Sequence, residues 1–336
     1  MSTQRLPIAL TMGDPAGCGP QITQAAWQGR ERHQLPAFYV LGSPDIYCES
    51  PTIRIEHPAD AIDVFDKALP VLPVSDDGVS EVQIGHPDPA YAAEIIESIR
   101  LATEHTLSGQ SAAIVTNPIS KAVLYEAGFS HPGHTEFIAG ICSAADSQTY
   151  KPVMMLIGGG LRVALATIHV PLMQVLQHLT ASHLSEVARL THRALIRDFG
   201  VSSPRIAFTG LNPHAGEGGS IGTEEQELIN PVAARLRSEG LSIANARPAD
   251  TIFHEALSGR YDAVIAMTHD QGLIPVKTLD MWGGVNTTLG LPIIRTSPDH
   301  GTAYEAAAAS TCRPDSLIAA LKQAKLMVQS REISDG

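Results

Sequence analysis

The sequence predicts an α/β protein built on a mostly parallel sheet, and three observations support this fold class. Short apolar runs alternate with amphipathic helical stretches along the whole chain. The runs are continuous, which is typical of strands buried on both faces. Loops rich in Gly, Pro and Asn follow the runs, and no low-complexity linker interrupts the alternation. Strands and helices that alternate in this way form sheets with helices on both sides.

The expected elements follow from these runs. We expect strands at Pro7–Met12, Ala37–Leu41, Ala112–Thr116, Val153–Ile157, Leu161–Thr167, Arg205–Thr209 and Ala263–Met267. We expect helices at Tyr91–Leu107, His183–Phe199, Glu224–Glu239 and Pro314–Val328. The three glycines at 158–160 lie between two strand-like runs and predict a hairpin turn.

Composition excludes several classes of protein. The chain has 336 residues and a net charge of −12, which argues against a nucleic-acid-binding surface. The N-terminal segment has no signal-peptide pattern, and its first apolar run is too short to span a bilayer. Four scattered cysteines (Cys18, Cys48, Cys142 and Cys312) suit a reducing cytoplasm and exclude a thiolate zinc site. We therefore expect a cytoplasmic protein.

Common nucleotide and hydrolase motifs are missing from the sequence. GDPAGCGP follows a strand and precedes a helix, as a phosphate-binding loop would, but it lacks the Gly-Lys-Ser/Thr of a Walker loop. It also does not fit the GxGxxG dinucleotide fingerprint, and no GxSxG elbow is present. Neither a P-loop NTPase nor a Rossmann dehydrogenase nor an α/β-hydrolase is indicated by motif.

Three histidines follow three of the apolar runs: His169 after VALATI, His214 after RIAFTGLNP, and His269 after AVIAMT. In parallel sheets, ligands bind beyond the carboxyl ends of the strands. Three neutral imidazoles with an open position suit a divalent metal that acts as a Lewis acid. Each histidine alone is more often a hydrogen-bonded structural residue, but the shared placement favours a metal site.

Further polar residues cluster near strand exits. PGHTEF carries His134 and Thr135 at the start of a helix, and HDQGLIPVK carries Lys277. The segment from 284 to 303 adds Asn286 and Arg295. A Lys and an Arg beside a metal would serve a substrate that carries phosphate or carboxylate.

Two aspartates, Asp250 in RPADTIF and Asp270 beside His269, have two equally supported interpretations. One is helix capping or a salt bridge. The other is orientation of an imidazole or proton transfer.

Taken together, these motifs resemble the 4-hydroxythreonine-4-phosphate dehydrogenase family of pyridoxine biosynthesis. The resemblance covers essentially the whole chain and is carried by GDPAG, LNPHAGEGG, PADT, HDQGL, GVN-TLGLP and IRTSPDHGTA. It implies NAD-dependent oxidation of the secondary alcohol of 4-phosphohydroxy-L-threonine, with decarboxylation to 3-amino-2-oxopropyl phosphate. NADP is the alternative cofactor, and the cofactor-binding residues are not assigned.

The resemblance also implies a set of site residues. His169, His214 and His269 would hold one divalent metal (zinc, cobalt or magnesium), with His269 reaching in from the other subunit of a homodimer. Substrate contacts would come from His134, Thr135, Lys277, Asn286 and Arg295. Lys277 is a hypothesis for the proton-transfer residue, with Asp250 and Asp270 as competitors.

The fold implied by the resemblance is that of the isocitrate and isopropylmalate dehydrogenases, with two α/β/α domains around a cleft. We expect a discontinuous first domain at 1–130 and 276–336. The second domain, 131–275, would carry metal ligands and dimer contacts. One departure concerns Tyr304–Arg313, where relatives have an Ala-Gly-x-Gly segment beside the cofactor's adenosine and this chain has no glycine. Cys18 replaces a usually apolar residue, and we expect a mild effect.

Other functions stay open at this point. Related enzymes act on phosphorylated threonate or erythronate, or on dihydrodiol carboxylates. Outside the family, a metal-dependent hydrolase or isomerase could use the three histidines without NAD. A non-catalytic metal- or ligand-binding protein is disfavoured by the polar residues expected around the histidines.

Overall fold

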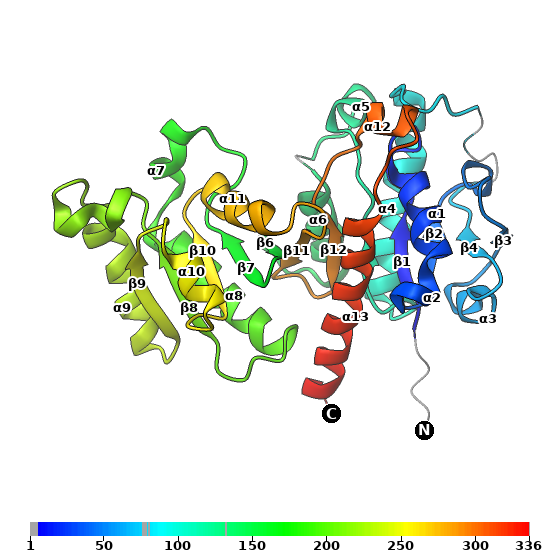
Figure 1. Cartoon of the computed structure of the whole chain (residues 1–336). Coiled ribbons are helices and arrows are strands. Elements are labelled where there is room, and N and C mark those ends of the chain that lie inside the picture. The colour runs from blue at the N-terminus through cyan, green and yellow to red at the C-terminus, as the bar shows by residue number, and fades with distance from the viewer. Residues whose placement is uncertain (1–5, 76–78, 80, 132, 336) are drawn as a thin grey trace. The chain divides into compact units, whose positions relative to one another are not determined.

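The computed structural model describes residues 6–75, 79, 81–131 and 133–335, which form two compact units (Figure 1). Unit 1 comprises Met1–Pro152 and Leu291–Val328, and unit 2 comprises Val153–Gly290 and Gln329–Gly336. From the sequence we expected the chain to pass between the two domains at 130/131 and 275/276. The boundaries between the units lie later in the chain, because the hairpin of unit 2 begins at Val153 and its sheet includes the strand that ends at Leu289.

Unit 1 contains a parallel sheet in the order β3-β4-β2-β1-β5-β12. The strands are β1 (Ile8–Thr11), β2 (Phe38–Leu41), β3 (Thr52–Arg54), β4 (Leu69–Leu72), β5 (Ile114–Val115) and β12 (Arg295–Pro298). β1 and β2 are buried at every position. Their continuous apolar sequences are therefore explained by burial on both faces, as predicted.

Helices connect these strands. They are α1 (Gly19–Gln28), α2 (Arg30–His33), α3 (Ala61–Val64), α4 (Ala92–Leu107), α5 (Lys121–Glu126), α6 (His134–Asp146) and α12 (Tyr304–Ala308), and α13 (Asp315–Asp335) begins in this unit. The predicted helix at Tyr91–Leu107 is confirmed as α4. Ser98 of α4 fastens the helix to the sheet, because its Oγ donates to Leu41 O at 2.6 Å and accepts from Met12 N at 3.1 Å.

Unit 2 contains a mixed sheet in the order β11-β6-β7-β10-β8-β9. The strands are β6 (Val153–Gly158), β7 (Leu161–Leu165), β8 (Arg205–Thr209), β9 (Ser242–Arg247), β10 (Ala263–Ala266) and β11 (Val285–Leu289). β7, β10, β8 and β9 are parallel, while β6 pairs antiparallel with both β7 and β11. The predicted hairpin at the three glycines is confirmed.

Helices cover both faces of the unit 2 sheet, so this unit has the predicted α/β/α layering. They are α7 (Val175–His178), α8 (Ala181–Arg197), α9 (Asn230–Ser238), α10 (Ile252–Leu257) and α11 (His269–Leu279). Strand residues alternate between two apolar clusters: Ile265 packs with α8 and α9, whereas Val264 packs with α10 and α11. Each cluster is one core layer.

The predicted helix at Glu224–Glu239 is divided in the structure. Its first turn, Glu225–Ile229, is π-helical, and α9 begins at Asn230. Pro231 lies in the first turn of α9 and has no N–H to donate, so the ordinary helical hydrogen bonding is interrupted there. In the described part of the chain, no helix is long and apolar enough to cross a bilayer.

The glycine-free segment Tyr304–Arg313 keeps a backbone shape that favours glycine. After α12, Ser310 adopts φ 53°, in the left-handed region. Tyr304 at the start of α12 donates its hydroxyl to Asp14 Oδ2 at 2.6 Å. A serine at this turn therefore raises the free-energy cost of the left-handed conformation relative to glycine, but the turn still forms.

We predict that Ser310→Gly stabilises the protein by about 1 kcal/mol, because a side chain in the left-handed region costs roughly 1–2 kcal/mol. Thermal unfolding measures the effect. Ser238→Gly is the matched control: this exposed serine ends α9, where glycine should instead destabilise by up to about 1 kcal/mol. Equal effects of the two substitutions would contradict the prediction.

Candidate active site

The three predicted metal-binding histidines all lie in unit 2, beyond the carboxyl ends of β7, β10 and β8. These strands are parallel neighbours in that order, so they end at the same edge of the sheet. His169 follows β7, His269 is the first residue of α11 after β10, and His214 lies in the loop after β8. The sequence therefore predicted the common edge correctly.

Hydrogen bonds join the exits of the three strands. Ala166 N donates to Ala266 O at 2.8 Å, and Thr167 Oγ1 donates to Met267 O at 2.7 Å. On the other side of β10, Met267 N donates to Thr209 Oγ1 at 3.0 Å. The backbone positions that lead to the histidines are thus fixed relative to one another.

The start of α11 orients His269. Thr268 caps the helix and forms a capping box with Gln271, whose Nε2 also donates to Gly210 O at 3.0 Å. Gly272 allows α11 to pack closely on β7, because a Cβ there would lie 2.4 Å from Leu165 Cδ2. His269 is consequently held at the edge of the sheet by both its cap and its helix.

Asp270 lies beside His269, with its Oδ1 2.9 Å from His269 Nδ1. A carboxylate in this position accepts from Nδ1–H and leaves Nε2 as the electron-pair donor, an arrangement typical of metal-binding histidines. The Asp270 side chain is otherwise 82% exposed. This geometry favours an orienting role for Asp270.

His169 and His269 of one chain form a pair whose ring centroids are 5.6 Å apart. Two imidazoles bound to one ion at about 2.0–2.1 Å would have centroids roughly 5 Å apart. The pair therefore fits two corners of a metal site. Among the described residues, no group of three His, Cys, Asp or Glu side chains could hold a metal.

His214 stands apart from this pair. The resemblance implied that His269 comes from the partner subunit, and within one chain His269 lies beside His169. His214 is exposed and has φ 51° in a loop whose residues 214–218 all have positive φ. His214 is therefore carried by a left-handed loop at the surface, and His169 is exposed as well.

A buried carboxylate, Glu225, organises the loop that carries His214. Glu225 is 1% exposed, and its Oε1 accepts from Leu211 N at 2.7 Å and Asn212 N at 2.8 Å. Its Oε2 accepts from Asn212 Nδ2 at 3.0 Å. The sequence suggested only that this acidic segment begins a helix, so the role of Glu225 in the loop was missed.

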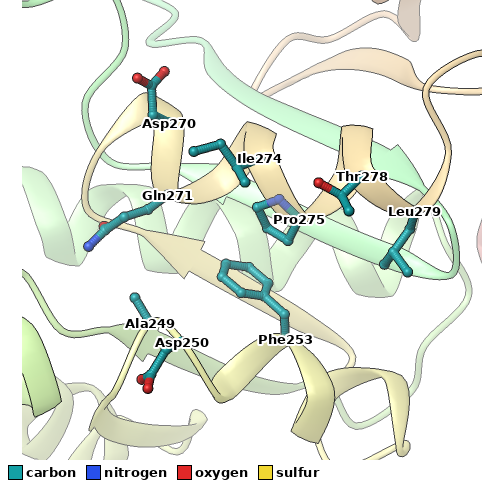
Figure 2. Close-up of a pocket in the computed structure, with 9 residues that line it drawn as sticks. All are labelled: Ala249, Asp250, Phe253, Asp270, Gln271, Ile274, Pro275, Thr278 and Leu279. Atoms are coloured by element: carbon teal, nitrogen blue, oxygen red, sulfur yellow. The ribbon is translucent and has the colours of Figure 1, made fainter.

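A hollow of about 540 Å³ lies between α10 and α11 (Figure 2). Its walls are mainly apolar, with Phe253 of α10 directed toward Pro275 of α11, and Asp250 and Asp270 lie at its margin. None of the three histidines lines it, nor does Lys277. The hollow therefore meets the histidine pair only through Asp270, which lines it and contacts His269.

Lys277 and Asn286 belong to unit 2 as well. Lys277 is half-buried on α11, two turns after His269, or about 12 Å along the helix axis. Asn286 lies on β11 opposite Leu156 of β6, and its buried Oδ1 has no hydrogen-bond partner within the described residues. This amide is available to a ligand.

The remaining predicted substrate residues, His134, Thr135 and Arg295, lie in unit 1. Arg295 opens β12 and is 3% exposed, and its Nη2 donates to Thr116 Oγ1 at 2.7 Å. Burial lowers the pKa of Arg295 to about 10, although the charge of Glu136 opposes this shift. The guanidinium still carries its positive charge at neutral pH.

His134 and Thr135 are the first two residues of α6. Burial lowers the pKa of His134 well below its usual value, and the positive charges of Arg295 and Lys121 lower it further. Its Nε2 is buried without a hydrogen-bond partner among the described residues. His134 is therefore neutral at pH 7 and lies in a positively charged environment.

Comparison with known proteins identifies the family. The model of the pyridoxal phosphate biosynthetic protein PdxA family matches residues 35–324. The chain belongs to this family. It is 49% identical to a 4-hydroxythreonine-4-phosphate dehydrogenase of Maricaulis maris, over 98% of this chain and 99% of the relative. A relative of the same name in Methylorubrum populi is 46% identical over 98% of this chain and 96% of its own length.

Solved structures agree with this assignment. A 4-hydroxythreonine-4-phosphate dehydrogenase from Klebsiella pneumoniae has a TM-score of 0.83 at 35% identity, covering 96% of this chain and 100% of that one. A terephthalate 1,2-cis-dihydrodiol dehydrogenase from Burkholderia xenovorans has a TM-score of 0.64 at 25% identity, covering 96% and 98%. The chain is accordingly an enzyme of the oxidoreductase class.

We predict that Glu225→Ala destabilises the protein by roughly 3–5 kcal/mol, because three buried donors lose a charged acceptor. Thermal or urea unfolding measures this change. The control is Glu224→Ala, since this neighbour is half-buried and accepts a side-chain hydrogen bond from Asn212 Nδ2 at 2.6 Å. The control should lose about 1 kcal/mol or less. A similar loss in both variants would contradict the assigned role of Glu225.

Proposed function

We propose that the enzyme oxidises the secondary alcohol of 4-phosphohydroxy-L-threonine with NAD and releases carbon dioxide, giving 3-amino-2-oxopropyl phosphate in pyridoxal phosphate biosynthesis. The observation that carries the proposal is the His169–His269 imidazole pair at the edge of the unit 2 sheet. Family membership and the names of the relatives support the substrate and the reaction.

The proposed metal is a divalent ion held by His169, His214 and His269. The donors fit, because paired imidazoles suit zinc or cobalt better than magnesium, and Asp270 fixes the His269 tautomer. When bound, such an ion supplies Lewis-acid stabilisation of negative charge on the substrate's oxygen. The contribution of the chain is to orient the imidazoles, as the Asp270–His269 contact illustrates.

The proposed assembly is a homodimer in which His214 comes from the partner. Within one chain the described residues bring two imidazoles together without a third ligand, and this supports the proposal that another copy supplies the third. Exposed apolar side chains directly follow His169: Leu172 is 77% exposed and Met173 is 91% exposed. We take Leu172 and Met173 as part of the proposed interface between copies.

Arg295, His134 and Thr135 are the proposed phosphate contacts. Arg295 is charged and buried, so an oxyanion bound there would be poorly screened by water. The amide of Asn286 and the ammonium of Lys277 are proposed as further substrate contacts. Lys277 is also the proposed proton-transfer residue, because Asp270 contacts His269 and Asp250 lies on the wall of the hollow between α10 and α11.

NAD is the proposed cofactor, with NADP as the alternative. The segment at 304–313 retains its left-handed residue at Ser310 although it lacks glycine. The backbone path expected beside the adenosine is therefore compatible with the resemblance. The experiment that tests the whole proposal is a substrate panel assayed for reduced nicotinamide with NAD or NADP, before and after chelation of metal. Turnover without nicotinamide reduction would contradict it.

Dihydrodiol carboxylates are the alternative substrate class, because a structural neighbour is a terephthalate dihydrodiol dehydrogenase. Such compounds carry no phosphate. Efficient oxidation of a dihydrodiol carboxylate, with none of the phosphorylated compound, would select this alternative.

We predict that mixing His214→Ala and His169→Ala protomers restores one working site in each heterodimer. The intact site takes His169 and His269 from the first chain and His214 from the second. Activity and bound metal, measured after subunit exchange, should both reappear.

The control for this prediction is a mixture of His169→Ala and His269→Ala protomers, which should remain inactive because each chain has lost one member of the same pair. Recovery in this control instead would mean that His269 crosses the interface. No recovery in either mixture, despite confirmed exchange, would mean that one chain supplies all three ligands.

We predict that Arg295→Met lowers kcat/KM for the phosphorylated substrate by about one to two decades, since a charge-assisted hydrogen bond contributes roughly 1.5–3 kcal/mol. The analogue without phosphate should lose much less. Steady-state kinetics on both compounds measures the difference. Equal losses on the two compounds would show that Arg295 acts by supporting the fold around Thr116.

A further inference from the structure

Lys121 lies against the start of α6, next to the proposed phosphate contacts in unit 1. It is the first residue of α5, and its side chain is exposed. A Cβ built on Gly133, the residue that precedes α6, would lie 3.5 Å from Lys121 Nζ and 3.3 Å from its Cε. Because Gly133 has no side chain, the ammonium group of Lys121 can approach the start of α6.

The charges around this point are not balanced. Arg295 and Lys121 both act as positive charges on His134, whereas Glu136 is the carboxylate that acts on Arg295. The same Gly133 Cβ position lies 3.3 Å from Glu136 Oε2. Two cations against one carboxylate leave an excess of positive charge beside the first turn of α6.

The polar groups at this point are also incompletely satisfied. His134 Nε2 is buried with no hydrogen-bond partner among the described residues. Gly133 provides no side-chain cap for the first N–H groups of α6, a 13-residue helix. Backbone N–H groups at a helix start, an imidazole and two cations all favour an oxyanion.

We propose that Lys121 binds the phosphate group of the substrate directly, together with Arg295 and His134. The inference rests on the proposed function and adds a residue to its phosphate site. A phosphate dianion matches this cluster better than a carboxylate, because it carries two charges and three acceptor oxygens. Lys121 supplies a point charge from the solvent-exposed side, while the buried guanidinium of Arg295 supplies several N–H donors in one plane.

The direct test uses inorganic phosphate as the probe in calorimetric titrations. We expect Lys121→Met to weaken phosphate binding roughly tenfold to hundredfold, and Lys121→Arg to retain most of the affinity because the charge remains. Lys322→Met is the matched control, since Lys322 is an exposed lysine of α13 in the same unit and its loss changes the net charge equally. The control should bind phosphate like the unaltered chain.

Kinetics provide the second readout. With 4-phosphohydroxy-L-threonine, Lys121→Met should raise KM by a similar factor with a small change in kcat, because the phosphate is bound in both the ground and transition states. Equal phosphate affinity in Lys121→Met and the unaltered chain, or no phosphate binding to the unaltered chain at millimolar concentration, overturns the proposal. If the substrate panel fails while phosphate binding still depends on Lys121, the proposed function falls and the phosphate site stands.

Discussion

The parallel arrangement of β7, β10 and β8 is the constraint on which the metal half of the site depends. Parallel strands end at one edge, and here their exits are also joined through Thr167, Met267 and Thr209. These bonds fix the backbone before any ligand binds. The backbone that leads to His169 and His269 is therefore preorganised by the fold, which reduces the entropy that binding of a ligand there would otherwise cost.

The imidazole pair and the cluster of cationic groups belong to different units. Unit 2 presents imidazoles, one of which (His269) contacts a carboxylate, while unit 1 presents cations around a neutral histidine. Positive charge close to the imidazoles would oppose binding of a metal cation, whereas the same charge favours a phosphate. The described groups of unit 1 therefore favour an anion, and the carboxylate beside His269 in unit 2 favours a cation.

Much of this organisation could be predicted from the sequence, because buried strands leave continuous apolar runs. Arg205–Thr209 was predicted with its observed bounds, and several other strands differ only at their ends. β11 (VNTTL) and β12 (RTSP) were missed because their polar side chains hide the strand signal. Glu225 and Lys121 were also missed. Glu225 is distinguished by its contact with the loop at Leu211, and Lys121 by its position beside Gly133. Both contacts join residues that are distant in sequence, so local sequence patterns do not reveal them.

The central claim is that the edge of the unit 2 sheet supplies imidazole ligands to one divalent ion. X-ray absorption spectroscopy of the zinc-loaded protein tests it most directly. We expect three imidazole nitrogens at about 2.0–2.1 Å, together with one or two oxygen ligands. In the His214→Ala variant, the fit should retain two imidazoles. A shell of carboxylate or water oxygens without imidazole, or a thiolate at about 2.3 Å, would contradict the account.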